Sequence, residues 1–507
     1  MSLQHSPSIV TNGLVLYLDA ANPKSYQTTP STFAVEVLVV AGGGSGGYGE
    51  PNPNGGGGGG GGAGGLIYKT SYSTTIGQSC TVTVGAGGLI PTSSSTAGNN
   101  GGNSVFDTLT AIGGGAGGGG DFEGTNAGTT GGSGGGAGGD GTYDVTIFSA
   151  GTTGQGNRGG IRVGSTNRAG QGGGGAGLPG QSGTVGNNGT GQGGTGGDGL
   201  QYSISGTPTY YAGGGGGGSQ DFASGTVSSI PGLGGGGAGG GNAAAAAGIA
   251  NTGGGGGGGY GIAGGAGGSG IVIIRYLGSQ QADGGTVTSV GGYTIHTFTT
   301  VGSSSFIPRG TWTDLSGNSN NGSLIGAPTY SASVGGNLFL NGTSKYVNFN
   351  SITNFPAGAT PRTVSLVLKI NDSTVNQWIY GLGGRLGTSY NFAIAYNVAG
   401  GANCYKFEGY SNDYFTSIAP VIGQTHELTI VYNGSTNVYY YNGVAADQNT
   451  LGALNTATLN YRIGTDNNPI PSSYSNINVY NFKIYNRALS VNEVSQNFNA
   501  LRGRYGI

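Results

Sequence analysis

Glycine runs constrain this chain more than any other feature. Residues 41–270 hold 92 of its 121 glycines, often in unbroken runs such as Gly55 to Gly62 and Gly253 to Gly259. Such a stretch loses much backbone entropy when it orders, and it has few side chains with which to form an apolar core. Any folded state must therefore be held by backbone hydrogen bonds between closely packed segments. Collagen is excluded, because the runs follow no Gly-X-Y period and the chain has only 16 prolines.

Two states remain for the glycine block. It is either a flexible linker or a bundle of polyglycine II helices, with about three residues per turn and hydrogen bonds to neighbouring helices. Strand-like pieces interrupt the glycines, and a linker would not need them. In Cys80 to Val84, for example, polar and apolar residues alternate as in a half-exposed strand. These interruptions favour the packed bundle. The other strand-like pieces are residues 66–72, 105–109 and 143–148.

Two strongly apolar segments bracket the block. Val35 to Val40 precede it and Ile271 to Tyr276 follow it. Their β-branched residues predict strands that are buried on both faces. If the two strands pair, the ends of the block meet at one place. We expect a further short β segment at residues 284–300.

Composition limits the partners and the cellular context. Only 7% of the residues are charged, the net charge is −2, and no basic stripe is visible, so nucleic acid binding has little support. Polarity comes from Ser, Thr, Asn and Gly, as in extracellular β-rich proteins and virion proteins. We expect no signal peptide and no membrane insertion, since the N-terminus lacks the signal pattern and no apolar run is long enough to span a bilayer. Cys80 and Cys404 are expected to be free buried thiols.

The residues after 309 predict an antiparallel β-sandwich. Arg362 to Lys369 and His426 to Tyr432 have the pattern of strands, and the second runs into the hairpin signal Asn433-Gly434. One helix is expected near the C-terminus. Ser490 and Glu493 predict its capping box, and Gly503 is expected to end it.

Several of these segments resemble a known domain. Gly13 to Tyr26 and Gly310 to Asn318 resemble the opening of laminin-G-like, concanavalin-A-type sandwich domains of phage virion proteins. Leu338 to Val347 and Phe482 to Ser490 resemble later parts of the same domain. In such domains a few residues separate the first two segments, whereas here the whole glycine block lies between them. The resemblance therefore implies a split sandwich. Its first strand lies in residues 1–27, the inserted domain is 28–309 with its core at 35–276, and the remainder is 310–507.

The inserted part has a resemblance of its own. Val35 to Gly44, Val84 to Gly88 and Gly268 to Tyr276 resemble the glycine-rich domain of bacteriophage tail fibre and adhesin proteins, and Gly291 to Thr299 recurs around such domains. This resemblance implies a virion protein made in the host cytoplasm. Its partners would be other virion proteins and a host surface polysaccharide or lipopolysaccharide, and it would form a homo-oligomer such as a trimer. The implied fold is mainly β, with polyglycine II-type packing in the insertion and one C-terminal helix.

Catalytic motifs are absent from the sequence. The histidines are His5, His296 and His426, and none has a nucleophile motif nearby. No cluster of acidic residues on one strand has the pattern of a glycosidase. Matches to glycine-rich nucleotide-binding motifs lack the βαβ context that such a motif requires. We therefore expect no enzyme. The alternatives to an adhesin are a structural or decoration protein without a ligand, and a polysaccharide depolymerase.

Aromatic residues in the sandwich form the best binding candidate. Aromatic faces stack on sugar rings, and neighbouring amides and carboxylates bind the hydroxyls. For any single residue a place in the core is favoured instead, since Tyr and Trp are common in strands. The candidates are Trp378, Tyr380, Tyr390, Tyr405, Tyr410, Asn412 and Asp413.

Two further candidate sets complete the predictions. Loops on a rigid scaffold can vary without disturbing packing, so interruptions of the glycine block are a second recognition candidate. The alternating oxygen ligands of residues 314–320 resemble a loop that binds a hard cation, although a turn that caps its own backbone is favoured. No cofactor is expected, with a calcium ion as the alternative. The loop candidates are Phe122, Tyr143, Arg158, Arg162 and Tyr210, and the candidate ligands are Asp19, Asp314, Asn318 and Asn320.

Overall fold

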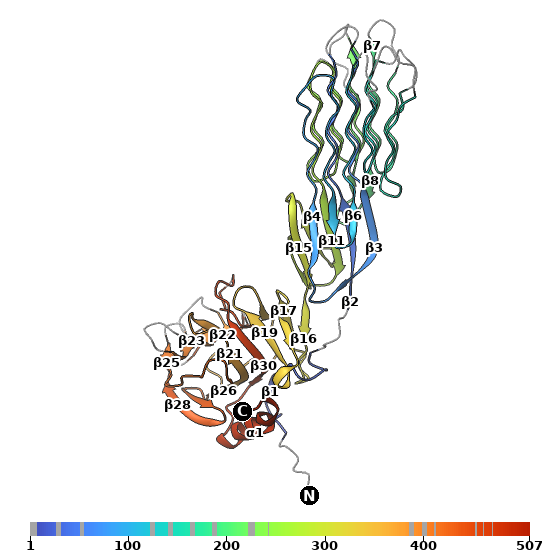
Figure 1. Cartoon of the computed structure of the whole chain (residues 1–507). Coiled ribbons are helices and arrows are strands. Elements are labelled where there is room, and N and C mark those ends of the chain that lie inside the picture. Colours follow the sequence, from blue (N-terminus) through green and yellow to red (C-terminus); the bar gives the residue numbers. More distant parts are fainter. Residues whose placement is uncertain are drawn as a thin grey trace. The chain divides into compact units, whose positions relative to one another are not determined.

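The computed structural model divides into two units (Figure 1), each with its own apolar core. The sandwich unit comprises Met1–Ser31, Thr75–Gln78 and Ile307–Ile507, and the glycine unit comprises Thr32–Thr74 and Ser79–Phe306. The predicted mainly antiparallel β fold with one C-terminal helix is confirmed for the described residues. The structure describes residues 8–26, 32–50, 55–121, 127–139, 146–162, 168–184, 190–221, 229–241, 243–384, 390–397, 403–409, 412–451, 454–459, 461–468 and 470–507.

The first sheet of the sandwich unit has eight strands. β1 (Leu14–Asp19) pairs with residues 481–485 of β30 (Asn476–Tyr485), and β19 (Asn337–Asn341) pairs with residues 476–479 of the same strand. Two strands from opposite ends of the insertion therefore share one edge of β30. β18 (Thr329–Ser331) pairs with β19, and the short 3-10 helix η1 (Ser333–Gly335) lies between these two strands in the sequence. On the other side of β30 follow β21 (Arg362–Ile370), β26 (Thr425–Tyr432), β27 (Thr436–Tyr441) and β28 (Val444–Thr450).

The second sheet also has eight strands, and its inner face packs on the first sheet. Alternate residues point inward, as the two-residue period of a strand requires. Leu366 and Leu368 of the first sheet and Leu382 and Ile394 of the second are fully buried in this core. The strands of the second sheet, in order, are β16 (Gly310–Trp312), β17 (Gly322–Ile325), β20 (Tyr346–Phe349), β29 (Tyr461–Ile463), β22 (Gln377–Gly383), β23 (Asn391–Asn397), β24 (Cys404–Glu408) and β25 (Tyr414–Phe415).

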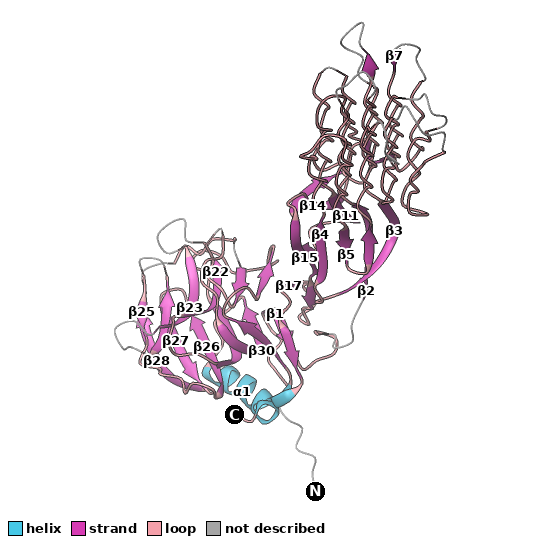
Figure 2. Cartoon of the chain, turned by 45° about the horizontal axis from the view of Figure 1, so that its top comes forward, coloured by secondary structure: helices cyan, strands magenta, loops and turns pink. Residues whose placement is uncertain are grey.

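The helix α1 (Val491–Tyr505) packs on the outer face of the first sheet (Figure 2). Its predicted capping box is present, because Ser490 accepts a hydrogen bond from the Glu493 N–H and Glu493 accepts one from the Ser490 N–H. The predicted end at Gly503 is wrong. The ring of Tyr505 packs on Tyr480 with 5.5 Å between centroids, which holds the last turn in place. The helix ends instead at Tyr505 and is capped by Gly506, whose φ of 70° lies in the left-handed region.

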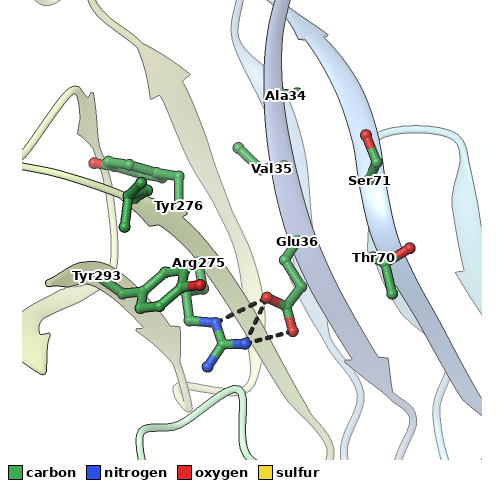
Figure 3. Close-up of a pocket in the computed structure, with 9 residues that line it drawn as sticks. Ala34, Val35, Glu36, Thr70, Ser71, Arg275, Tyr276 and Tyr293 are labelled. Carbon is green, nitrogen blue, oxygen red and sulfur yellow. Dashed lines mark hydrogen bonds and ion pairs between the residues drawn. The ribbon is translucent and has the colours of Figure 1, made fainter. Parts of the chain in front are cut away.

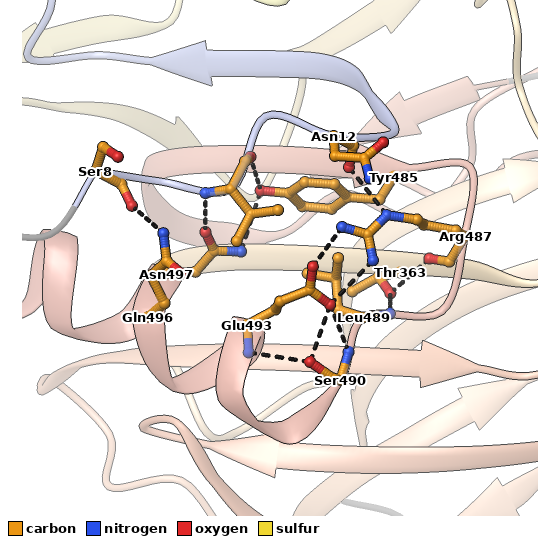
Figure 4. A network of polar contacts seen from close by, with 11 residues as sticks. Ser8, Asn12, Thr363, Tyr485, Arg487, Leu489, Ser490, Glu493, Gln496 and Asn497 are labelled. Atoms are coloured by element: carbon orange, nitrogen blue, oxygen red, sulfur yellow. Dashed lines mark hydrogen bonds and ion pairs between the residues drawn. The ribbon is translucent and has the colours of Figure 1, made fainter.

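The N-terminal segment is held by this C-terminal part of the chain (Figure 4). The Val10 N–H donates to Asn497 Oδ1 at 2.8 Å, and the Tyr485 hydroxyl donates to the Val10 carbonyl at 3.1 Å. Arg504 Nη1 lies 2.6 Å from Asp19 Oδ2. Side chains of β30 and α1 therefore bind a segment that is separated from them by almost the entire sequence.

The glycine unit contains two five-stranded sheets that enclose an apolar core. The two bracketing strands pair as predicted: Val40 lies opposite Ile271 and Glu36 opposite Arg275. The ends of the glycine block therefore meet. One sheet has the order β13 (Thr286–Val290), β14 (Tyr293–Phe298), β11 (Ile271–Leu277), β2 (Thr32–Val40) and β3 (Leu66–Thr75), and the other has β12 (Ala282–Asp283), β15 (Gly302–Pro308), β4 (Cys80–Val84), β5 (Ser104–Phe106) and β6 (Leu109–Ala111).

Short strands and isolated bridges occur within the glycine block. The pairs are β7 (Thr190–Gly191) with β10 (Gln220–Asp221) and β8 (Leu200–Tyr202) with β9 (Thr209–Tyr211). Of the strand expected at 143–148, residues 143–145 lie outside the described residues, and Ile147 forms an isolated bridge with Arg162. Cys80 and Cys404 are free and buried, as expected.

The glycine segments run side by side and hydrogen-bond to several neighbours each (Figure 1). In residues 42–47, each N–H donates to a different segment from the one before it, and every third residue returns to the same segment. This repeat is that of a helix with about three residues per turn and no internal hydrogen bonds. The donor and acceptor pairs are Gly42 with Gly102, Gly43 with Gly268, Gly44 with Gly62, Ser45 with Asn99, Gly46 with Gly265, and Gly47 with Gly59.

The packing explains why these positions are glycine. A Cβ at Gly44 would overlap the carbonyl oxygen of Gly115, and a Cβ at Gly58 would overlap that of Gly47. The segments lie so close that backbone occupies the space of a side chain. The glycine block is therefore an ordered polyglycine II-type bundle rather than a linker.

Candidate functional site

The outer face of the first sheet is covered by α1, and polar groups are enclosed there. Glu427 and Lys483 are almost completely buried. Glu427 accepts a hydrogen bond from Ser365 Oγ at 2.9 Å, and Lys483 Nζ donates to Asn481 Oδ1 at 2.6 Å. Burial raises the pKa of the Glu427 carboxyl, while Lys483 nearby opposes this. Because these groups lie beneath the helix, they do not form a site that an external ligand can reach.

The outer face of the second sheet carries a row of four residues on neighbouring strands. Trp378 on β22 lies opposite Ala395 on β23, and Ala395 lies opposite Lys406 on β24. Lys406 in turn lies opposite Phe415 on β25. Residues next to them in sequence, such as Tyr405, belong to the inner core, so this row faces outward. The row therefore places an aromatic ring on each side of a small residue and a lysine.

Lys406 binds two carboxylates on this face. Its Nζ lies 2.7 Å from Glu408 Oε1, 2.9 Å from Asp413 Oδ2 and 5.2 Å from the centroid of the Phe415 ring. The Gly409 N–H donates to Asp413 Oδ1 at 3.1 Å. Partial burial opposes the charge of Lys406, but its hydrogen bonds to the two carboxylates raise its pKa above the usual value. The group is an ammonium bound to two carboxylates beside an aromatic ring.

Exposure differs along the row. Phe415 is 51% exposed and the Asp413 side chain 36%, whereas Trp378 is 9% exposed and packs on Ala393 and Ala395. The part that a ligand can contact is therefore the end formed by β24 and β25. We call Lys406, Glu408, Asp413 and Phe415 the aromatic–carboxylate patch.

The other aromatic candidates are not at the surface. Tyr380 and Tyr405 are fully buried between the sheets, and the Tyr405 hydroxyl donates to His426 Nε2. These two residues fill the core, which was the alternative interpretation of the pattern, and they present no face to a sugar. Tyr390 is half-buried, and Tyr410 lies outside the described residues.

Among the earlier candidates, Asp413 belongs to the patch and Asn412 precedes it in the segment that leads into β25. Lys406, Glu408 and Phe415 were not among the predicted site residues. Lys406 and Glu408 have the i, i+2 spacing that places two residues on the same face of a strand. That signal identifies a shared face, but it does not say whether the face points outward.

The loop candidates of the glycine block are scattered. Tyr210 is 39% exposed on β9, and Arg158 is partly buried, with Nη1 donating to the Gly159 carbonyl at 3.0 Å. Arg162 is fully buried, so it cannot contact an external ligand as we expected. Phe122 and Tyr143 lie outside the described residues. The described arginines of this set bind backbone carbonyls, Arg158 that of Gly159 and Arg162 that of Gly138.

The candidate cation loop, residues 314–320, forms hydrogen bonds to β1. Asp314 Oδ1 accepts hydrogen bonds from the N–H groups of Tyr17 and Ser316, and Oδ2 accepts from the Asn320 N–H at 3.0 Å and the Ser316 hydroxyl. Asn318 and Asn320 turn their amide nitrogens to the Val15 carbonyl. Donors surround the carboxylate, so the oxygens point to N–H groups rather than to a cation. These contacts are those of a turn that caps its own backbone, which is the interpretation that the sequence favoured.

The remaining proposed ligand, Asp19, belongs to a different contact. Its carboxylate pairs with Arg504 and accepts hydrogen bonds from the Tyr17 and Tyr505 hydroxyls. It therefore has protein partners of its own. Among the described residues, no group of three or more His, Cys, Asp or Glu side chains is placed to hold a metal ion. The described helix is also too short and too polar to cross a bilayer.

A depression of about 230 Å³ lies on the glycine unit (Figure 3). Arg275 and Glu36 line it side by side on neighbouring strands, with Arg275 Nε 2.8 Å from Glu36 Oε2. The guanidinium lies 4.5 Å from the centroid of the Tyr293 ring, and its Nη1 donates to the Ser203 carbonyl. The Tyr68 hydroxyl donates to Glu36. Because both charged groups already have several partners and join the two bracketing strands, a structural role accounts for them.

Comparison with known families assigns both units. A family model described as the glycine-rich domain matches residues 21–277, just over half of the chain. The chain belongs to the glycine-rich domain family. A second model, described as the concanavalin A-like lectin/glucanases superfamily, matches residues 341–495. The glycine-rich domain is thus combined with a concanavalin A-like domain in the C-terminal half, and both domain resemblances are confirmed.

Solved structures resemble part of this glycine-rich domain protein. Domain 4 of AbnA, an extracellular GH43 arabinanase from Geobacillus stearothermophilus in complex with arabinotriose, is 20% identical with a TM-score of 0.30, over 36% of this chain and 91% of that one. A botulinum neurotoxin type C structure, described by its interaction with two ganglioside molecules, is 13% identical with a TM-score of 0.28, over 37% and 48%. Trypanosoma rangeli sialidase with the inhibitor DANA is 13% identical with a TM-score of 0.27, over 37% and 30%. No curated protein matches the chain.

Proposed function

We propose that this chain is a non-enzymatic adhesin of a bacteriophage virion and that its concanavalin A-like domain binds a glycan of the host surface. The observation that carries the proposal is the aromatic–carboxylate patch, where the half-exposed Phe415 ring adjoins Asp413 and Glu408. An aromatic ring stacks on the apolar face of a sugar, and carboxylate oxygens accept hydrogen bonds from its hydroxyls. The match to a superfamily that includes lectins supports the same ligand class.

The virion context rests on other observations. The bracketing strands and glycine runs resemble those of phage tail fibre and adhesin proteins, and few residues are charged. Backbone hydrogen bonds hold the glycine bundle together without a large apolar core. Such a bundle suits a protein that is exposed on a particle. Other virion proteins would be its partners, and a homo-oligomer, such as a trimer, remains a prediction.

The absence of catalysis in this proposal has a chemical reason. A glycosidase needs one carboxyl group that is protonated and can act as the acid. In the patch, Glu408 and Asp413 both bind the Lys406 ammonium, so neither carboxylate is directed at a glycosidic oxygen. Glu427 has a raised pKa but lies beneath α1, on the other sheet. Neither arrangement supplies an acid and a base on one accessible face.

Binding of the full chain to a glycan array and to purified host polysaccharide tests the proposal. Phe415→Ala should weaken binding about tenfold, because it removes the stacking ring. Tyr210→Ala is the matched control, since it removes an exposed aromatic ring from the glycine unit. If Tyr210→Ala weakens binding and Phe415→Ala does not, recognition belongs to the glycine block.

Two other outcomes separate the alternative functions. A chain that is retained in the particle but binds no glycan would be a structural or decoration protein. Release of reducing ends from host polysaccharide would identify a depolymerase. Both outcomes contradict the proposal of a non-enzymatic adhesin.

A further inference from the structure

Two cations that the structure describes on the patch face, Lys406 and Arg462, are already bound to protein groups. Lys406 Nζ binds Glu408 and Asp413 and lies close to the Phe415 ring. Arg462, on the same outer face, donates from Nη1 to the carbonyls of Asp466 and Asn468 and from Nε to Asn348. Arg462 is also 6% exposed. Neither of these cations is directed at an external ligand.

The accessible polar atoms of the patch are acceptors instead. The Asp413 side chain is 36% exposed, and among the described residues Gly409 N–H donates to Oδ1 and Lys406 to Oδ2. A carboxylate oxygen has lone pairs for more than one hydrogen bond. A ligand that approaches Phe415 therefore meets acceptors that can take further donors.

We propose that the patch selects neutral or amino-bearing, hydroxyl-rich sugars and rejects sugars that carry carboxylate, phosphate or sulfate groups. This inference rests on the proposed glycan-binding function. Hydroxyl and ammonium groups supply the donors that Asp413 can accept, while the ring contacts Phe415. An anionic sugar has to place its charge beside Asp413, and the cation that could neutralise it is already bound to two carboxylates.

The chain carries a further negative group near this edge. Asp447 accepts hydrogen bonds from the Tyr414 hydroxyl at 3.1 Å and from the Ser417 N–H at 2.6 Å, and both donors flank Phe415 in the sequence. Although burial opposes it, these hydrogen bonds lower the pKa of Asp447, so it is ionised at neutral pH. Because Tyr414 packs on the inner core, this charge lies at the edge of β25 and not on the face that carries Phe415.

An array of paired glycans tests the selectivity with the full chain. Each neutral glycan is printed beside its sialylated, sulfated or uronic-acid counterpart. We expect the neutral member of a bound pair to bind about tenfold more tightly at low salt, and the difference to narrow as salt screens the repulsion. Asp413→Asn, which removes a charge and keeps the shape, should reduce the ratio between the two members.

The outcomes separate this inference from the function on which it rests. Tighter binding of the acidic members, or an unchanged ratio in Asp413→Asn, overturns the selectivity but leaves glycan binding intact. Binding of no member of any pair overturns both. A neutral preference that Phe415→Ala abolishes along with binding supports both and assigns them to the same patch.

Discussion

At the scale of single residues, the hydrogen bond between Tyr405 and His426 joins the two sheets within the core. His426 Nδ1 lies 3.1 Å from the Gln424 carbonyl, which requires an N–H at that nitrogen. Nε2 is then free to accept the proton of the Tyr405 hydroxyl, so the neutral imidazole satisfies both contacts. Burial lowers the pKa of His426 to about 4, although the hydrogen bond to Gln424 opposes this.

This pKa predicts a loss of stability in acid. The unfolded chain binds a proton at His426 below about pH 6.5, whereas the folded chain resists it until about pH 4. Neutral His426 therefore contributes to the free energy of unfolding above pH 6.5. This contribution is lost as the pH falls from 6.5 towards 4, by at most roughly 3 kcal/mol. Urea unfolding of the wild type and of His426→Gln at pH 7.5 and 4.5 measures it. The wild type should lose more stability than the variant, and equal losses would contradict the assignment.

At the scale of elements, the glycine segments form polyglycine II-type helices that have no side chains to pack. Their stability comes from hydrogen bonds to several neighbours, and their spacing leaves no room for a Cβ at the inward positions. Alternation and periodicity, which identify ordinary strands and helices, do not exist in such a segment. The structure of this part could be predicted only from the strand-like interruptions and the bracketing strands.

Alanine substitution in a run tests the packing. At Gly58 the added methyl group would overlap the Gly47 carbonyl, so Gly58→Ala should destabilise the glycine unit by about 1–3 kcal/mol. In a flexible segment the same change would be neutral or slightly stabilising. Thermal melting of Gly58→Ala beside Ser94→Ala, an exposed position in the same unit, makes the comparison. Identical melting of both variants would argue against the packed bundle.

At the scale of the whole molecule, the sandwich is assembled from both sides of the insertion. The Thr313 N–H donates to the Ser25 carbonyl at 2.7 Å, and the Leu315 N–H donates to the Tyr17 carbonyl at 2.8 Å. The chain before the insertion and the chain after it therefore run side by side. The continuous order of a sandwich is restored in space although it is interrupted in sequence.

This proximity predicts that the insertion can be removed. A chain in which Tyr26 is joined to Gly310 through a short turn should be soluble and should melt cooperatively, because the joined ends already lie close together. A chain of residues 310–507 alone is the control. It lacks β1, exposes the edge of β30 and should aggregate or melt at a lower temperature. Equal behaviour of the two chains would mean that β1 contributes little to the fold.

The sequence by itself determined the local elements. The β-branched runs at Val35 to Val40 and Ile271 to Tyr276, the Asn-Gly turn after β26 and the capping box at Ser490 each depend on neighbouring residues, and all are present. The sequence predicted less well which face of the sheet each side chain occupies. A register irregularity between Trp378 and Tyr380 changes which residues of β22 face outward, and a bulge of this kind has no reliable signal in one sequence.

Only the tertiary structure decided what the polar groups do. Residues 314–320 have the same spacing in a cation loop and in a capping turn, and the difference is that the Tyr17 N–H, 297 positions away, donates to Asp314. Likewise, Lys406 and Asp413 form their ion pair because β24 and β25 pair, and this pairing brings Phe415 to the same place. The type of a local element depends on interactions over a few residues. The role of a carboxylate depends on which donors the folded chain brings to it from elsewhere.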